Sequence, residues 1–338
     1  MKDVARRAGV SFQTTSKVLR GGGTVADATR QRIRAAADEL GYVVNDLARS
    51  LVTQRTRTVG VVVGDLDDHI IARFVAGADR EARQNGYALV IISVETGSGQ
   101  GERSFRTLLE RRVDGIVTAA PQLEDDARFG ELLRTQVPTV SIHAISGGGV
   151  SRVGSDQRET ARLATQHLAA LGHTRIGMVT GPTSRRVARS RSQGYAAALS
   201  DAGRAIDDEL IAEGDWQPQS GYDAASAILS RAPDVTAMYV HNDLMAVGVL
   251  HAARDRGLTV PEDLAVVSCD DIPTAAHTIP PLTTVCLPMA ETGAAAVRLL
   301  LEQLVDGPDR IERLLLPVSL VCRASCGCGP ARHPSRAR

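Results

Sequence analysis

The stretch DVARRAGVSFQTTSKVL, residues 3–19, decides how the N-terminal part of the chain folds. Residues 3–8 place apolar side chains on one helical face, and Gly9 interrupts that pattern. Ser11 is positioned to cap a second helix over residues 12–20, because its hydroxyl can accept a free backbone N–H. Two helices joined by a glycine turn within so few residues predict a helix-turn-helix.

The outward side of the second predicted helix carries side chains suited to nucleic acid. A Gln amide pairs bidentately with adenine, and a Lys ammonium reaches guanine or a phosphate. The candidate DNA-contacting residues here are Ser11, Phe12, Gln13, Ser16, Lys17 and Arg20. A plain pair of packed helices would explain the periodicity but not this polar face.

A third helix is expected over residues 29–40, and the net charge of the N-terminal region also favours a nucleic-acid partner. Ile33, Ala36, Ala37 and Leu40 are predicted to face inward, and Gly41 ends the helix. Residues 1–58 hold eleven Lys or Arg against five Asp or Glu, although the whole chain of 338 residues is neutral. A basic module on an acidic body indicates a polyanionic partner for the module alone.

Residues 3–19, together with TRQRIRAAADELGYVVNDLARSL at residues 29–51, resemble the headpiece of the lac repressor (LacI/GalR) family of transcription regulators. The resemblance implies that the second helix enters the major groove, with Phe12, Gln13 and Lys17 as base readers. It also implies a hinge helix from Asn45 to Val52, with Asn45 among the DNA-contacting residues. Leu51 would there wedge into the minor groove and kink the duplex. The alternative for Leu51 is a linker leucine that docks on its own domain.

The start of the chain departs from the family pattern. Only two residues precede Asp3, whereas relatives usually carry a few more. The first helix is therefore expected to lack its cap, unless the true start lies upstream.

The remaining chain alternates apolar strands with helical stretches. YALVIISV, DGIVTAA, RIGMVTG and LAVVSCDD are examples of runs apolar enough to be buried on both faces. Such repeats predict parallel sheets covered by helices on both sides. The fold class expected is a small all-α headpiece followed by an α/β core of two doubly wound lobes, as in periplasmic binding proteins.

The sequence suggests the following domain limits. They are a headpiece at 1–44, a hinge helix and linker at 45–57, a core at 58–323 and a flexible tail at 324–338. Within the core, lobe 1 is expected at about 58–155 and 287–316, and lobe 2 at about 156–286 and 317–323.

Polar residues follow the predicted strands of the second lobe, where ligands of such sheets bind. Arg191, Asn242 and Asp270 can bond vicinal hydroxyls, and Trp216 can cover the apolar face of a sugar ring. Taken singly, the Arg could pair with an acid, the Asn could cap a helix, and the Trp could fill the core. Their joint placement favours a saccharide site.

The resemblance is closer to the lac repressor branch than to the purine-responsive branch, and it implies that these four residues contact a galactoside. The first lobe departs from that branch. His143 stands in place of an Asp, Ala119 in place of an Asn, Gly64 in place of a Ser and Met289 in place of an aromatic residue. The expected effector is therefore a saccharide rather than a defined galactoside, and His143 and Met289 complete the candidate effector site.

Motifs for catalysis are missing from the sequence. It has no G-x-G-x-x-G after a strand, no Walker loop, no G-x-S-x-G and no H-E-x-x-H. We therefore expect a regulator that is not an enzyme and has no cofactor beyond its sugar effector. A Rossmann-type sugar enzyme would need a phosphate loop or a catalytic pair, and the sequence shows neither.

Cys322, Cys326 and Cys328 crowd near the C-terminus with x3 and x1 spacing. A zinc site usually needs a fourth ligand and C-x2-4-C spacing. We expect incidental reduced thiols here and no metal.

The expected partners are a near-palindromic DNA operator, a saccharide and a second copy of the chain. With no signal peptide and no long apolar run, the predicted location is the cytoplasm, away from the membrane. The tail lacks leucine heptads, so no tetramerisation helix is expected. A periplasmic-type sugar-binding protein without a DNA role, and an activator of the same family, are the alternatives.

Overall fold

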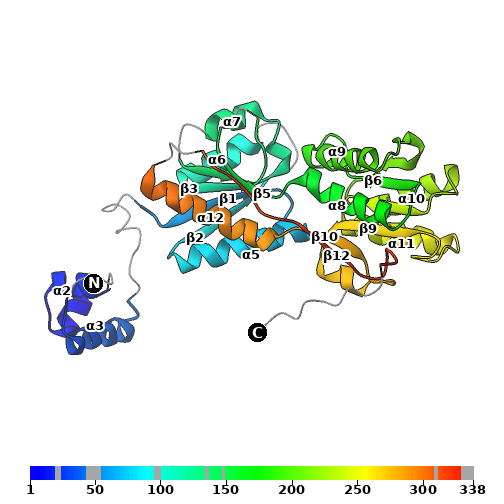
Figure 1. The fold of residues 1–338 in the computed structure, drawn as a ribbon. Coiled ribbons are helices and arrows are strands. Elements are labelled where there is room, and N and C mark those ends of the chain that lie inside the picture. Colours follow the sequence, from blue (N-terminus) through cyan, green and yellow to red (C-terminus); the bar gives the residue numbers. More distant parts are fainter. Residues whose placement is uncertain are drawn as a thin grey trace. The chain divides into compact units, whose positions relative to one another are not determined.

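The structure is a computed structural model. It describes residues 1–19, 24–42, 55–94, 100–133, 137–146, 149–307 and 311–328. The chain divides into two compact units, Met1–Arg57 and Thr58–Arg338 (Figure 1). Arg20, Asn45 and Leu51, which the sequence assigned to DNA contacts, lie outside the described residues.

The described residues of the first unit form three helices, α1 (Lys2–Ala8), α2 (Phe12–Leu19) and α3 (Asp27–Glu39). Gly9 ends α1 in the left-handed conformation, with φ of 63°. The predicted cap of α2 is confirmed, because the Ser11 hydroxyl accepts the Thr14 backbone N–H at 3.1 Å. Met1 stands at the start of α1 without a side-chain cap. The apolar core consists of Val4, Ala8, Val18, Ile33, Ala36 and Ala37.

Two predictions about this unit were wrong. Ser16 is buried, not outward. It lies about 60° around α2 from Leu19, at 100° per residue, so its short side chain remains at the edge of the core face. Leu40 was expected inside but is 47% exposed, because α3 ends at Glu39 and Leu40 already belongs to the turn.

The first lobe of the second unit is built on a parallel sheet in the order β11-β5-β4-β3-β1-β2. The strands are β1 (Thr58–Val63), β2 (Ala88–Ser93), β3 (Gly115–Ala119), β4 (Thr139–Ser141), β5 (Ser151–Gly154) and β11 (Arg313–Leu315). Helices α5 (His69–Gln84) and α12 (Met289–Asp306) pack side by side on one face. Helices α6 (Gln100–Glu110) and α7 (Ala127–Leu133) cover the other.

The second lobe repeats this plan with the order β12-β10-β9-β8-β6-β7, in which only β12 is antiparallel to its neighbour. The strands are β6 (Ile176–Thr180), β7 (Ile211–Glu213), β8 (Ala237–Val240), β9 (Ala265–Asp270), β10 (Thr283–Cys286) and β12 (Ser319–Val321). Helices α8 (Gln157–Ala170) and α9 (Arg186–Asp201) cover one face. Helices α10 (Pro218–Arg231) and α11 (Asp243–Asp255) cover the other. Short 3₁₀ turns occur at Pro121–Leu123, Asp208–Leu210 and Pro273–His277.

The strands are buried as the apolar runs predicted. All five residues of β3 and all six of β9 are buried, as expected for a parallel sheet covered on both faces. The predicted two-lobed α/β core is confirmed.

The chain passes between the two sheets three times. It leaves β5 for α8, returns from β10 to α12, and leaves β11 for β12. Residues that follow the strands of both sheets line one cavity between the lobes. Among the described residues, no helix is both long and apolar enough to span a membrane.

Candidate functional site

The cavity between the lobes has a volume of about 700 Å³. Ligands of parallel α/β sheets bind beyond the carboxyl ends of the strands, and this cavity lies at those ends. The structure brings all six predicted effector residues to its wall, namely His143, Arg191, Trp216, Asn242, Asp270 and Met289. We call it the effector cavity.

Arg191 is held on three sides at this wall. It stands on α9 and is only 4% exposed. Its Nε donates to Gln157 Oε1 at 2.9 Å, one Nη donates to the His241 carbonyl, and the other lies 3.4 Å from Asp270 Oδ1. A planar guanidinium fixed on three sides is preorganised to donate its remaining N–H groups to a ligand.

Asp270 ends β9 beside Arg191. Burial raises the pKa of its carboxyl to about 7 even though the Arg191 charge opposes that rise. Asp243, the first residue of the neighbouring helix α11, is similarly affected, because burial raises its pKa to about 6 against hydrogen bonds from Ser268 and Thr284. Titratable groups perturbed in this way concentrate at functional sites.

Trp216 covers one side of the cavity. Its indole stacks on His241 with ring centroids 6.4 Å apart and planes 27° apart. It also lies over Gly181, where an added Cβ would come within 2.1 Å of the ring. The indole can reach this position only because residue 181 has no side chain.

Asn242 both caps a helix and lines the cavity. As the cap of α11, its side-chain oxygen accepts the Met245 N–H at 2.9 Å. Its amide nitrogen donates to the Trp216 carbonyl at 3.0 Å while the residue lines the cavity. The cap therefore holds Trp216 in place as well as starting the helix.

Residues at this wall and directly beside it have strained backbone conformations. Trp216, Asp270 and Asp271 have positive φ values of 77°, 119° and 54°. Non-glycine residues rarely adopt this region, and such strain tends to persist at ligand sites. No pattern in the sequence marked these three residues as strained.

The first lobe supplies polar atoms that lack partners. His143 pairs through Nδ1 with Glu124 at 3.0 Å. Among the described residues, the buried atoms without a hydrogen bond include His143 Nε2, His69 Nε2 and Gln122 Oε1, and all three residues line the cavity. Buried polar groups are normally satisfied, so these atoms call for a polar ligand.

Gly64, which stands where the family pattern has a Ser, lies next to the Gln122 side chain. A Cβ at residue 64 would come within 2.8 Å of the Gln122 side-chain amide. The glycine therefore leaves room for Gln122 at the wall. The sequence reading did not find Gln122, His69 or Glu124, because no motif precedes them and only the strand ends could have indicated them.

Arg186 joins the lobes at the rim of the cavity and was also missed. From α9 it donates to Asp125 Oδ1 at 2.9 Å, to the Ala144 carbonyl at 3.1 Å and to Ser146 Oγ. All three partners belong to the first lobe. We call this set the rim latch.

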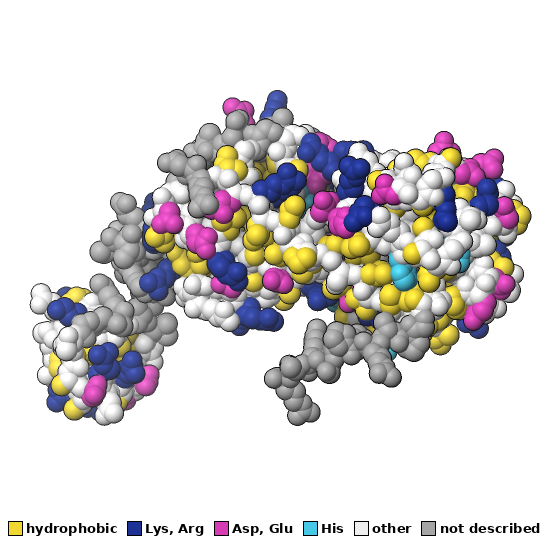
Figure 2. All heavy atoms as spheres, in the orientation of Figure 1, with side chains coloured by type: hydrophobic (Ala, Val, Ile, Leu, Met, Phe, Trp, Pro, Cys, Tyr) yellow, Lys and Arg dark blue, Asp and Glu magenta, His cyan; other side chains and the backbone are white. Residues whose placement is uncertain are grey.

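The α2 face of the first unit offers exposed polar groups. Ser11, Gln13 and Lys17 are exposed, and Phe12 is 49% exposed. Dark-blue Lys and Arg side chains stand out on this unit in the face drawn in Figure 2. The arrangement suits a recognition helix in the major groove.

A helix-turn-helix unit joined to a two-lobed α/β unit with a polar cavity defines the class of ligand-responsive DNA-binding regulators. Residues 1–45 match the family described as "Bacterial regulatory proteins, lacI family", and residues 165–326 match "Periplasmic binding protein-like domain".

Individual relatives extend this match over nearly the whole chain. The ribose operon repressor of Escherichia coli (strain K12) is 36% identical over 326 residues, which is 96% of this chain and 99% of the relative. The regulator CelR of Thermobifida fusca is 34% identical over 334 residues, or 95% of this chain and 96% of the relative. This protein belongs to the lacI family.

Solved structures agree. A lac repressor dimer bound to operator and the anti-inducer ONPF is 34% identical, with a TM-score of 0.86, over 96% of this chain and 97% of that one. A CelR–cellobiose complex is 34% identical, with a TM-score of 0.74, over 96% and 98%.

Proposed function

We propose that this protein is a cytoplasmic transcription repressor without catalytic activity, which binds a near-palindromic operator as a homodimer. A saccharide held in the effector cavity releases it from that operator. The observation that carries the proposal is the fixed Arg191–Asp270 pair beside Trp216 in a cavity of about 700 Å³. Charge-assisted donors and acceptors next to an aromatic face are what a ring bearing vicinal hydroxyls requires.

The relatives support the chemical class. One is a repressor of a ribose operon, and one solved structure is a complex with cellobiose. The unpartnered atoms of His69, Gln122 and His143 offer further hydrogen bonds to hydroxyls from the first lobe. A galactoside remains one of the saccharides to be tested.

The mechanism follows from the three crossings between the lobes. A ligand that contacts both walls favours the closed arrangement, and it acts only through its different affinities for the two arrangements. The lobes change their angle by bending at the three crossings. The saccharide disfavours the arrangement in which the dimer binds the operator. Two-fold symmetry of the dimer matches two half-sites of the operator.

A binding screen tests the proposal. Trp216 is the only tryptophan of the chain, so its fluorescence reports on the effector cavity alone. We expect one of ribose, cellobiose, lactose or galactose to change the emission and to raise the melting temperature in a saturable manner. A response only to purines or nucleosides, with none to any sugar of a broader panel, would reject the saccharide.

A further inference from the structure

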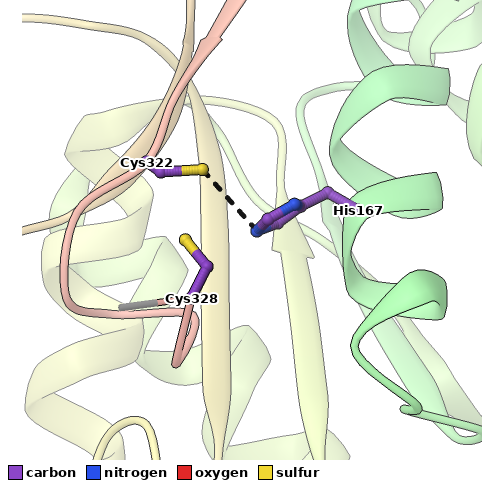
Figure 3. A group of neighbouring side chains, drawn as sticks. All are labelled: His167, Cys322 and Cys328. Atoms are coloured by element: carbon purple, nitrogen blue, oxygen red, sulfur yellow. Dashed lines mark hydrogen bonds between the residues drawn. The ribbon is translucent and has the colours of Figure 1, made fainter. Parts of the chain in front are cut away.

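Three cysteines and one histidine meet in the second lobe, and none of them lines the effector cavity. His167 comes from α8, and Cys322, Cys326 and Cys328 come from the segment after β12. Figure 3 shows the His167 imidazole pointing toward the thiols of Cys322 and Cys328. The sequence offered three thiols without a fourth ligand, and the fold supplies that ligand from a residue more than 150 positions away.

The distances within this group are short. His167 Nε2 lies 3.2 Å from Cys326 Sγ and 4.0 Å from Cys322 Sγ. Cys326 Sγ lies 3.0 Å from Cys328 Sγ. The ligand atoms of His167, Cys322 and Cys328 all lie within 4.8 Å of one another.

The local backbone holds the thiols together. Gly327 has a φ of 77°, so the chain turns sharply between Cys326 and Cys328. Ser325, just before them, donates to the Val266 carbonyl at 2.6 Å and accepts the Thr283 N–H at 2.8 Å. These two bonds fasten the cysteine turn to β10 and to the start of β9.

The spacing fits a tetrahedral metal. With Zn–S of about 2.3 Å and Zn–N of about 2.0–2.1 Å, ligand atoms around zinc are about 3.5–3.8 Å apart. The observed separations bracket that range. Thiolate and imidazole are also the ligands that zinc prefers in closed structural sites.

A disulfide fits less well. The Cys326–Cys328 sulfur separation of 3.0 Å is well beyond the bonded length of about 2.05 Å. All three thiols also lie within the seven residues 322–328, and a Cys326–Cys328 disulfide would leave Cys322 and His167 without a common partner.

We propose that His167, Cys322, Cys326 and Cys328 form a Cys3His site for Zn²⁺. The metal would tie the segment after the third crossing to α8, the helix that follows the first crossing. At its other end α8 carries Gln157, which holds Arg191. The site is structural, because four protein ligands leave no open position for substrate. It does not depend on the proposed effector or operator.

The test uses the full chain purified with a reductant. It is loaded with Zn²⁺ alone, dialysed, and its metal is measured by mass spectrometry and by release to a chromogenic chelator. We expect about one zinc per chain. In Cys328→Ser and His167→Gln the bound zinc should fall to near zero under the same dialysis. Cys286→Ser, a half-buried cysteine outside the group, is the matched control and should keep its zinc.

Cobalt gives a second readout, which reports the coordination geometry and the thiolate ligands directly. Co²⁺ in the wild type should show the visible bands of tetrahedral coordination and a thiolate charge-transfer band, and both should weaken in Cys328→Ser. Circular dichroism confirms that each variant is folded. Zinc retention equal in all variants, absence of the charge-transfer band, or a Cys326–Cys328 disulfide in the reduced preparation would overturn the proposal.

Discussion

At the residue scale, the effector wall depends on side chains that are fixed before any ligand arrives. Arg191 is bonded to Gln157, to the His241 carbonyl and to Asp270. Rigid first contacts reduce the ordering cost of binding. Trp216 and Asp270 are held in strained backbone conformations for the same wall.

Gly181→Ala tests how the Trp216 indole packs against residue 181. The added Cβ would come within 2.1 Å of the indole, so the ring must move. We expect a shifted emission maximum in the free protein and at least tenfold weaker saccharide binding. Gly203→Ala is a control for glycine replacement, since nothing lies within 4 Å of its added Cβ and only its left-handed φ of 70° is strained. Unchanged emission in Gly181→Ala would contradict the packing described.

Asp270 gives a prediction about pH. Its folded pKa of about 7 lies above its ordinary value of 3.8, so the native state binds more protons than the unfolded state between these values. The contribution of Asp270 to stability is therefore full at low pH and is lost as the pH rises through about 7. The Asn amide of Asp270→Asn does not titrate in this range, so this variant does not lose that stability as the pH rises.

Between about pH 5 and about pH 8, the wild type should therefore lose about 3 kcal/mol more unfolding free energy than Asp270→Asn does. Urea unfolding at both pH values measures the change. A difference between the two proteins that is independent of pH would show that the Asp270 carboxyl is not perturbed in this direction.

At the scale of elements, α2 combines a buried and an exposed face within eight residues. Gln13 is exposed and has the amide geometry for a base edge. Gln13→Ala should weaken binding to a selected operator by about 5- to 150-fold, corresponding to about 1–3 kcal/mol for a bidentate base contact.

Fluorescence anisotropy with labelled operator measures this effect. Gln31→Ala, an exposed glutamine of α3, is the matched control and should bind as the wild type does. Non-specific binding should change little in either variant, because phosphate contacts dominate it. Equal losses of operator affinity in the two variants would show that Gln13 does not contact a base specifically.

The elements that the sequence predicted well are those whose pattern is local. The Ser11 cap, the Gly9 turn and the apolar strands each depend on neighbouring residues, and all are present. Ser16 and Leu40 were misplaced because both stand at the margin of a buried face. There a few tens of degrees of rotation or one residue of helix length decides exposure.

Contacts between segments far apart in the chain could not be predicted from the sequence. Arg191, Asn242 and Asp270 could be predicted because each follows a strand in a recognisable run. Gln122 at the cavity wall and His167 beside the cysteines follow no motif, and only the folded chain brings them to their partners.

At the scale of the whole molecule, the rim latch links the lobes over the cavity. Arg186 and Asp125 are part-exposed, with side-chain exposures of 33% and 61%, so solvent screens their attraction. Such a pair contributes about 0.2–1 kcal/mol. Asp125 itself does not line the cavity.

Asp125→Asn should therefore weaken saccharide binding by about 1.5- to 5-fold, because it destabilises the closed arrangement without touching the ligand. Titration calorimetry measures the affinity. Asp234→Asn, which removes an ion pair with Arg175 inside the second lobe, is the matched control. Tighter binding by Asp125→Asn would show that the latch opposes closure.

The most direct test of the central claim is operator release by the saccharide found in the fluorescence screen. Operator affinity is measured by anisotropy for the wild type, Arg191→Lys and the control Arg175→Lys, with and without the sugar. Lysine keeps the charge but loses the planar fork, so the site loses charge-assisted bonds worth about 1.5–3 kcal/mol. The account predicts that all three bind operator equally without sugar, and that Arg191→Lys needs about 10- to 100-fold more sugar for release. Release of Arg191→Lys at the wild-type sugar concentration would contradict it.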